Sequence, residues 1–132
     1  MSSLHYQRAW ITLAPRNFSK ACEFYSNLLG KPPDRTLMRS DQLIYAEFHL
    51  MGFNLGIYAP KSQPESSGYS PLSMCFQVDD LEAAIELITG LGYPPPGEIV
   101  TASHGREVYA FDPDGNRLIL YQAKIRSQSD VH

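Results

Sequence analysis

The two halves of this 132-residue chain repeat one another, which restricts the folds open to it more than any other feature. Residues 30–33 read GKPP and residues 92–95 read GYPP, while residues 55–58 read LGIY and residues 118–121 read LILY. These matches lie 62 and 63 residues apart, and the order of predicted elements is the same in both halves. We therefore predict two copies of one supersecondary unit.

The first half has the pattern of a strand, a helix and three more strands. Asn17 is a good N-cap, apolar residues then recur at helical spacing, and Gly30 is suited to end the helix. Residues 43–50 alternate between apolar and polar, as expected of a strand with one buried face. The expected elements are a helix at 18–29 and strands at 6–14, 35–39, 43–50 and 53–59.

The second half follows the same order. Asp79 and Asp80 precede an apolar helical pattern that ends at Gly92. Residues 112–116 read DPDGN, a turn in which proline presets φ, glycine accepts positive φ, and Asp and Asn can bond the nearby backbone. The expected elements are a helix at 81–91 and strands at 72–78, 98–103, 106–111 and 117–123.

These patterns predict an α+β fold in which two βαβββ modules form a curved mixed sheet around a cup, with the helices on the outer face. The repeats cover about 5–59 and 72–123 and make up one domain, 1–123. Residues 60–71 are rich in Pro, Ser and Gly and are expected to be a linker, and 124–132 a polar tail. Small ligands commonly bind in concave sites between repeated units.

Composition excludes several classes of partner. The net charge is −3 and no basic cluster occurs, which disfavours nucleic-acid binding. No apolar run is long enough for a membrane span, and the first residues lack a signal-peptide pattern. Cys22 and Cys75 lie in apolar segments, as expected of reduced thiols. We expect a cytoplasmic protein.

Three motifs resemble those of one superfamily. Residues 17–30 (NFSKACEFYSNLLG) resemble D-L-x-x-x-x-x-F-Y-x-x-x-L-G, residues 76–81 (FQVDDL) resemble F-x-V-D-D-L, and residues 112–120 (DPDGNRLIL) resemble D-P-D-G-N-x-x-E-L. They are similar to the vicinal oxygen chelate superfamily of glyoxalase I, bleomycin resistance proteins and extradiol dioxygenases. The resemblance implies a two-module single chain that forms a homodimer. It leaves function open, because the family includes lyases, isomerases, dioxygenases and non-catalytic drug-binding proteins.

In metal-dependent members of that superfamily, four inward-facing residues supply His, Gln or Glu ligands to a divalent cation. The resemblance places these positions at Trp10, Gly56, Ser73 and Ile119. Trp and Ile cannot coordinate the ion, Gly has no side chain, and a lone Ser is a poor ligand. We therefore expect no metal at these positions and no cofactor.

The alternation of side chains along the strands predicts which residues line the inner face of the cup. Aromatic surfaces alternate with hydrogen-bonding groups, a combination typical of a pocket for a flat aromatic or amphipathic organic molecule. The inner-face residues expected to contact such a ligand are Trp10, Thr12, Tyr45, Glu47, His49, Asn54, Tyr58, Ser73, Cys75, Gln77, Arg117, Ile119 and Tyr121.

Three functions remain open at this point. The first is a metal-free protein that sequesters or carries a small molecule, similar to the bleomycin resistance branch. The second is an enzyme, either using Glu47 and His49 in acid–base chemistry or acting as a diverged glyoxalase-like lyase or dioxygenase-related protein. The third is an interaction module whose own side chains close the cup. The loss of all four ligand types favours the first, and the ligand stays unidentified.

Overall fold

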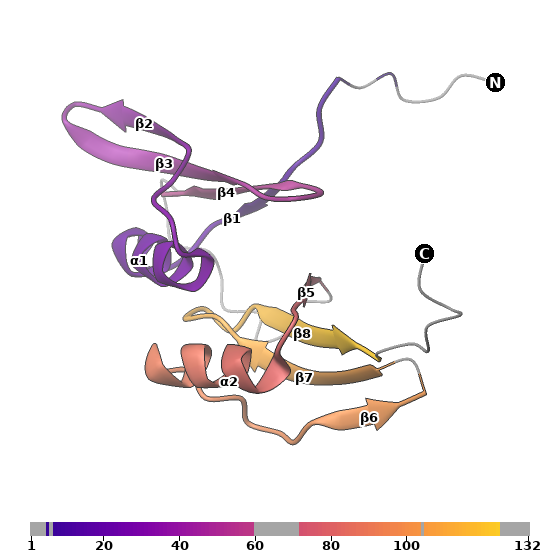
Figure 1. The fold of residues 1–132 in the computed structure, drawn as a ribbon. Helices are drawn as coiled ribbons and strands as arrows, with labels where there is room; N and C mark the ends of the chain where they lie inside the picture. The colour runs from indigo at the N-terminus through magenta and orange to yellow at the C-terminus, as the bar shows by residue number, and fades with distance from the viewer. Residues whose placement is uncertain (1–4, 6, 60–71, 104, 125–132) are drawn as a thin grey trace. The chain divides into compact units, whose positions relative to one another are not determined.

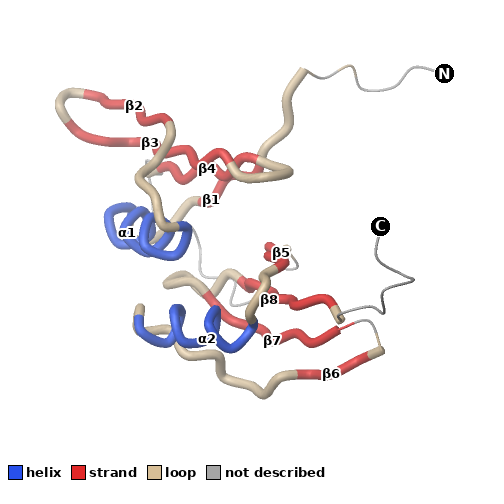
Figure 2. The backbone as a smooth tube through the Cα atoms, viewed as in Figure 1, coloured by secondary structure: helices blue, strands red, loops and turns tan. Residues whose placement is uncertain are grey.

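The computed structural model of this chain describes residues 5, 7–59, 72–103 and 105–124. The chain forms two compact units, one on either side of residues 60–71. Each unit is a βαβββ module with one helix and a four-stranded mixed sheet (Figure 1; Figure 2), which confirms the predicted α+β class and the two modules. The expected linker, and residues 125–132 of the expected tail, lie outside the described residues.

The first module has the strand order β1-β4-β3-β2. Strand β1 pairs with β4 in parallel, and the other neighbouring strands pair antiparallel. Its elements are β1 (Ile11–Leu13), α1 (Phe18–Leu29), β2 (Arg35–Arg39), β3 (Gln42–His49) and β4 (Asn54–Tyr58).

Helix α1 begins and ends where the sequence predicts. The Asn17 side chain accepts a hydrogen bond from the backbone N–H of Lys20 at 3.0 Å, and Gly30 ends the helix with a left-handed φ of 72°. The helix lies along one face of the sheet (Figure 1) and buries Ala21, Phe24 and Tyr25 there. This face of the first module therefore forms its core.

The strands supply the other half of that core. Ala46 and Phe48 of β3, with Leu55 and Ile57 of β4, are fully buried. Because side chains alternate across a strand, the residues between them lie on the opposite face. Residue Glu47 lies on that opposite face, and the rest of the candidate site is built around it.

The second module repeats this arrangement with strand order β5-β8-β7-β6. Its helix is capped by Asp80, which accepts a hydrogen bond from the backbone N–H of Ala83 at 3.0 Å. Neither helix of the described residues is long and apolar enough to span a membrane. The elements are β5 (Ser73–Gln77), α2 (Leu81–Gly90), β6 (Val100–Ala102), β7 (Gly105–Phe111) and β8 (Arg117–Ala123).

The turn between β7 and β8 is organised by Asp112, which is 4% exposed. Its carboxylate accepts hydrogen bonds from the backbone N–H of Asp114 at 2.9 Å and from that of Asn116 at 2.8 Å. The Asn116 side-chain amide donates a third bond at 2.8 Å, and Gly115 adopts φ of 84°. The recognisable DPDGN stretch is thus a self-bonded turn.

Four strands are shorter than predicted: β4 and β5 by one residue at each end, and β1 and β6 by more. The strand expected at 6–14 is reduced to Ile11–Leu13, because only these residues pair with β4. The strand expected at 98–103 is reduced to Val100–Ala102, the residues that pair with β7. Alternation alone does not show where a partner strand ends. The strands form two separate hydrogen-bonded sheets, and the single curved sheet around a cup stays a prediction.

Both cysteines are free thiols, as predicted. Burial raises the pKa of the Cys22 thiol to about 11, so that this thiol stays protonated at neutral pH. Cys75 is exposed on β5.

Candidate functional site

A buried carboxylate lies on the face of the first module's sheet that is opposite α1. Glu47 is 2% exposed and lies two residues from both Tyr45 and His49 on β3, so the three side chains share one face. The Tyr45 hydroxyl donates to Oε1 of Glu47 at 2.5 Å, and Nε2 of His49 lies 2.7 Å from Oε2. The Arg8 guanidinium lies 3.5 Å from the same Oε2. We call these four residues the Glu47 cluster.

The contacts hold Glu47 as an anion. The hydrogen bond from Tyr45, and then the contacts with His49 and Arg8, outweigh burial and lower the pKa of Glu47 below its ordinary value. Burial and the bond to Glu47 raise the pKa of Tyr45 to about 12, so its hydroxyl remains a donor. A carboxylate with a lowered pKa and occupied oxygens is a fixed charge rather than a strong general base.

The loop before β2 fixes the end of β3 that carries His49. The backbone N–H of His49 donates to Oδ2 of Asp34 at 2.7 Å, and Lys31 donates to the backbone carbonyl of His49 at 2.7 Å. Lys31 also pairs with Asp34 at 2.8 Å. The imidazole is half exposed and has Nε2 against Glu47. When the neutral ring carries its proton on Nε2, Nδ1 is the acceptor available for proton transfer.

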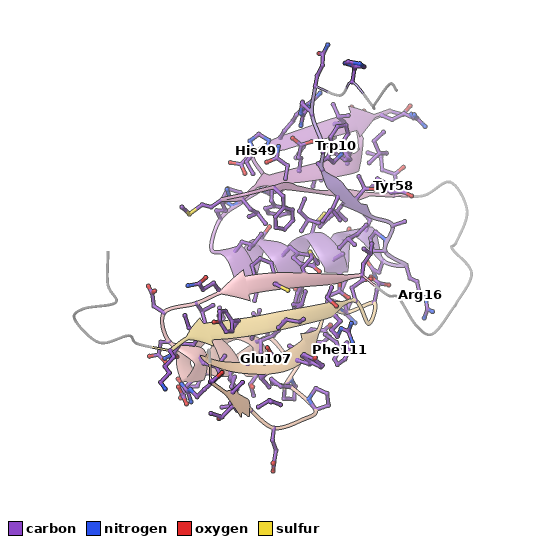
Figure 3. The ribbon with its side chains drawn as sticks, turned by 90° about the vertical axis from the view of Figure 1, so that its right-hand side faces the viewer. Trp10, Arg16, His49, Tyr58, Glu107 and Phe111 are labelled. Atoms are coloured by element: carbon purple, nitrogen blue, oxygen red, sulfur yellow. The ribbon has the colours of Figure 1, made fainter. Side chains whose placement is uncertain are left out.

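A hollow of about 320 Å³ adjoins the Glu47 cluster. Trp10 is 46% exposed, and the Arg8 guanidinium lies over its ring, 4.7 Å from the centroid. Figure 3 shows Trp10 and His49 on the side of the sheet away from α1. The residues lining the hollow are Arg8, Trp10, Thr12, Arg35, Leu37, Tyr45, Glu47 and Tyr58.

The position of Gly56 explains how Tyr45 reaches Glu47. Gly56 lies directly opposite Glu47 in the β3–β4 register. A Cβ atom at Gly56 would lie 2.5 Å from the Tyr45 hydroxyl and 2.9 Å from its Cε1 atom. The absence of a side chain at Gly56 therefore lets the Tyr45 ring lie over β4 in this position. Glycine inside a strand often marks such a close approach, so Gly56 itself is a signal in the sequence for this contact.

The positions that the resemblance assigned to metal ligands do not fit a divalent metal ion. At Gly56 the Tyr45 ring fills the space of a side chain, and Ser73 accepts a hydrogen bond from Nε of Arg117 at 2.6 Å. That guanidinium, 5.2 Å from the centroid of the Tyr109 ring, puts a positive charge beside the hydroxyl. Trp10 and Ile119 offer no donor atom. Among the described residues, no group of three or more His, Cys, Asp or Glu side chains could hold a metal.

The residues predicted to contact a ligand fall in both modules. Trp10, Thr12, Tyr45, Glu47 and Tyr58 line the hollow, and His49 contacts Glu47. Asn54, the first residue of β4, pairs with His49. In the second module, Ser73 and Arg117 are bonded to each other. The other members there share their face by strand register: Cys75, Gln77, Ile119 and Tyr121.

Three residues of the hollow were missed in the sequence, namely Arg8, Arg35 and Leu37. Arg8 has the parity of Trp10 and Thr12, so the predicted strand 6–14 already placed it on the correct face. Arg35 and Leu37 lie opposite Glu47 and Tyr45 in the register of β2 with β3. The sequence held no signal for that register, and only the parity of Arg8 could have been used.

Residues 7–120 match the Glyoxalase/Bleomycin resistance protein/Dioxygenase superfamily. Together with the two βαβββ modules, this match shows that the chain belongs to that superfamily, as a single chain that contains both modules. No curated protein matches the chain.

Solved structures share the fold across most of both chains. A glyoxalase / bleomycin resistance protein from Catenulispora acidiphila is 23% identical, with 90% of this chain and 100% of that chain covered and a TM-score of 0.64. The fosfomycin resistance protein FosX from Listeria monocytogenes is 19% identical, with coverage of 92% and 97% and a TM-score of 0.69. A hypothetical protein from S. aureus is 15% identical, with coverage of 90% and 95% and a TM-score of 0.73.

Proposed function

We propose that this protein is a metal-free binding protein that sequesters or carries a small organic molecule in the hollow beside the Glu47 cluster. The observation that supports this most directly is the place of Tyr45 over Gly56, a position assigned to a metal ligand. A ligating side chain at Gly56 would displace Tyr45 from Glu47. Two of the four assigned positions, Trp10 and Gly56, thus belong to a site of different chemistry.

The surface of the hollow suits an aromatic or amphipathic molecule. Trp10, Leu37 and Tyr58 are between 40% and 46% exposed, so that apolar area is available to a ligand. Hydrogen-bonding groups lie beside them, and such a combination provides stacking with a few orienting bonds. The proposal includes a cytoplasmic location, which the free cysteines suggest, and a homodimer, which the family resemblance suggests and light scattering of the purified protein tests.

Elemental analysis of protein purified without chelators tests the metal-free site. We expect manganese, iron, nickel and zinc far below one ion per chain, and no rise in the unfolding temperature when Mn²⁺, Ni²⁺ or Zn²⁺ is added, because a metal that binds the folded state would raise it. A stoichiometric divalent ion would overturn the proposal.

A second candidate function is an enzyme, such as a diverged glyoxalase-like lyase, in which His49 acts as the base. The 2.7 Å contact with Glu47 and the anchoring of the His49 backbone by Asp34 favour this role. Glu47 would then orient the imidazole rather than take up the proton. Turnover should be lost in both His49→Ala and Glu47→Gln, and activity that persists in His49→Ala would exclude this role.

A further inference from the structure

We propose that the ligand of this hollow is a planar organic anion, such as an aromatic carboxylate, with its anionic group bound by Arg8 and Arg35. The inference rests on the proposed binding function and adds the charge of the ligand. It follows from which charges in the hollow a ligand can reach.

The carboxylate of Glu47 is not accessible to a ligand. The side chain is 3% exposed, Oε1 accepts from Tyr45, and Oε2 faces His49 and Arg8. A cationic ligand could reach this carboxylate only by displacing one of these three partners, and would lose the hydrogen bond or ion pair which that partner makes. Glu47 therefore balances charge within the protein and does not attract a cation from solvent.

The positive charge of Arg8 remains accessible. Its side chain is 49% exposed, and its contact with Glu47 is long, at 3.5 Å from one terminal nitrogen. A guanidinium has five N–H donors in a planar fork, so most of the donors of Arg8 remain for a carboxylate. Because Arg8 lies over the exposed ring of Trp10, a ligand bound to the guanidinium has aromatic surface beside its anionic group.

Arg35 adds a second positive charge to the hollow. It lies opposite Glu47 in the β2–β3 register and lines the hollow. Among the described residues, no Asp or Glu forms an ion pair with it. Among the described residues that line the hollow, Glu47 is the only acid, so two arginines face one buried carboxylate. Charge complementarity then favours anions and disfavours amines.

Three probes of similar shape and different charge test the inference: 4-nitrobenzoate, 4-nitrobenzamide and 4-nitrobenzylamine. Trp10 is the single tryptophan of the chain, so its fluorescence reports on the hollow, and calorimetry gives a second reading. At neutral pH and low salt, we expect 4-nitrobenzoate to bind about tenfold more tightly than the amide, with the amine weakest, a difference equal to about 1.4 kcal/mol.

Substitutions of the two arginines test whether these residues cause the preference for the anionic probe. Arg35→Gln should weaken binding of 4-nitrobenzoate about fivefold and leave binding of the amide within about twofold, because only the anion loses an ionic partner. Arg8→Lys keeps the positive charge but loses the planar fork of N–H donors, and should also weaken binding of 4-nitrobenzoate. Arg39→Gln is the matched control, since it removes the same charge from the same strand but lies outside the hollow.

Some results would overturn the inference without touching the proposed function. Equal binding of benzoate and amide, tighter binding of the amine, or an equal effect of Arg35→Gln and Arg39→Gln would each refute selection for anions while a ligand still binds. If none of the three probes bound at concentrations up to about 20 mM, the inference would also be refuted, because a dissociation constant above that value is too weak for a ligand site. A metal found by elemental analysis would instead refute the proposed function.

Discussion

The two modules agree on the sheet face that packs against the helix and differ on the opposite face. Along the two central strands, each module buries four apolar side chains at equivalent register positions. These are Ala46, Phe48, Leu55 and Ile57 in the first module and Val108, Ala110, Leu118 and Leu120 in the second. Packing against a helix constrains this face in both modules, whereas the opposite face can change without loss of the core.

The opposite faces carry different chemistry at equivalent positions. Glu47 pairs with Gly56 in the first module, and Tyr109 pairs with Ile119 at the equivalent register position of the second. The small Gly56 admits Tyr45 and allows a buried anion. In the second module the polar contact is instead the bond from Arg117 to Ser73. The comparison shows that the same scaffold holds a buried carboxylate on this face in the first module and an arginine bonded to a serine in the second.

The largest effect is expected for substitutions on the sheet face that packs against the helix in both modules. Leu55→Ala and Leu118→Ala each remove a fully buried side chain at matched positions. We expect each to lower the free energy of unfolding by about 3 kcal/mol, as for other leucines truncated in a core. Urea denaturation followed by circular dichroism measures both. If one variant lost less than about 1 kcal/mol, the two cores would not be equivalent.

The next effect tests the difference between the opposite faces. Glu47→Gln replaces a buried anion by an amide that cannot accept from Tyr45, His49 and Arg8 together, and should lower the free energy of unfolding by about 2 kcal/mol. Glu107→Gln, on the half-buried part of β7 and without an ion pair among the described residues, is the control and should cost less than about 0.5 kcal/mol. Equal losses in chemical denaturation would remove the distinction between the modules.

A smaller effect tests the role of Gly56. Gly56→Ala places a methyl group where the Tyr45 ring lies, so the ring must move away from Glu47. We expect a loss of about 1.5 kcal/mol that largely disappears in the background of Tyr45→Ala, since the ring is then absent. Additive losses in this double-mutant cycle would show that Gly56 and Tyr45 act independently.

Local signals in the sequence were sufficient for most of the fold. Asn17 and Gly30 mark the two ends of α1, and the predicted bounds 18–29 are those observed. These signals act within one turn of the chain, through a side-chain cap and a left-handed φ. The edges of β1 and β6 were less predictable, because a strand ends where its partner ends.

The candidate site was predictable only in part. Parity placed Tyr45, Glu47 and His49 on one face, which the structure confirms. The hydrogen bond of Tyr45 across Gly56, and the approach of Arg35, depend on the register between strands that are distant in sequence. A single sequence contains alternation but not register, so these contacts could not be predicted.

The smallest expected effect is the dependence of stability on pH and salt, which distinguishes Glu47 from Glu82, an acid of the second module that pairs with Arg106. The pKa of Glu47 is lowered in the folded state, so its contribution to stability is present above the ordinary pKa of a glutamate and is lost as the pH falls through the lowered value. The stability difference between wild type and Glu47→Gln should therefore be constant above about pH 5 and shrink below about pH 4.

Arg106 lowers the pKa of Glu82 to about 2 through contacts of 2.6 and 2.9 Å, yet the Glu82 side chain is 61% exposed. Solvent and salt screen such a pair, so the difference between wild type and Glu82→Gln at neutral pH should be small and should vanish in about 1 M NaCl. The difference for Glu47→Gln should persist there, because its carboxylate is buried. Unfolding curves at both salt concentrations measure this, and a loss of both differences would place Glu47 at the solvent-exposed surface.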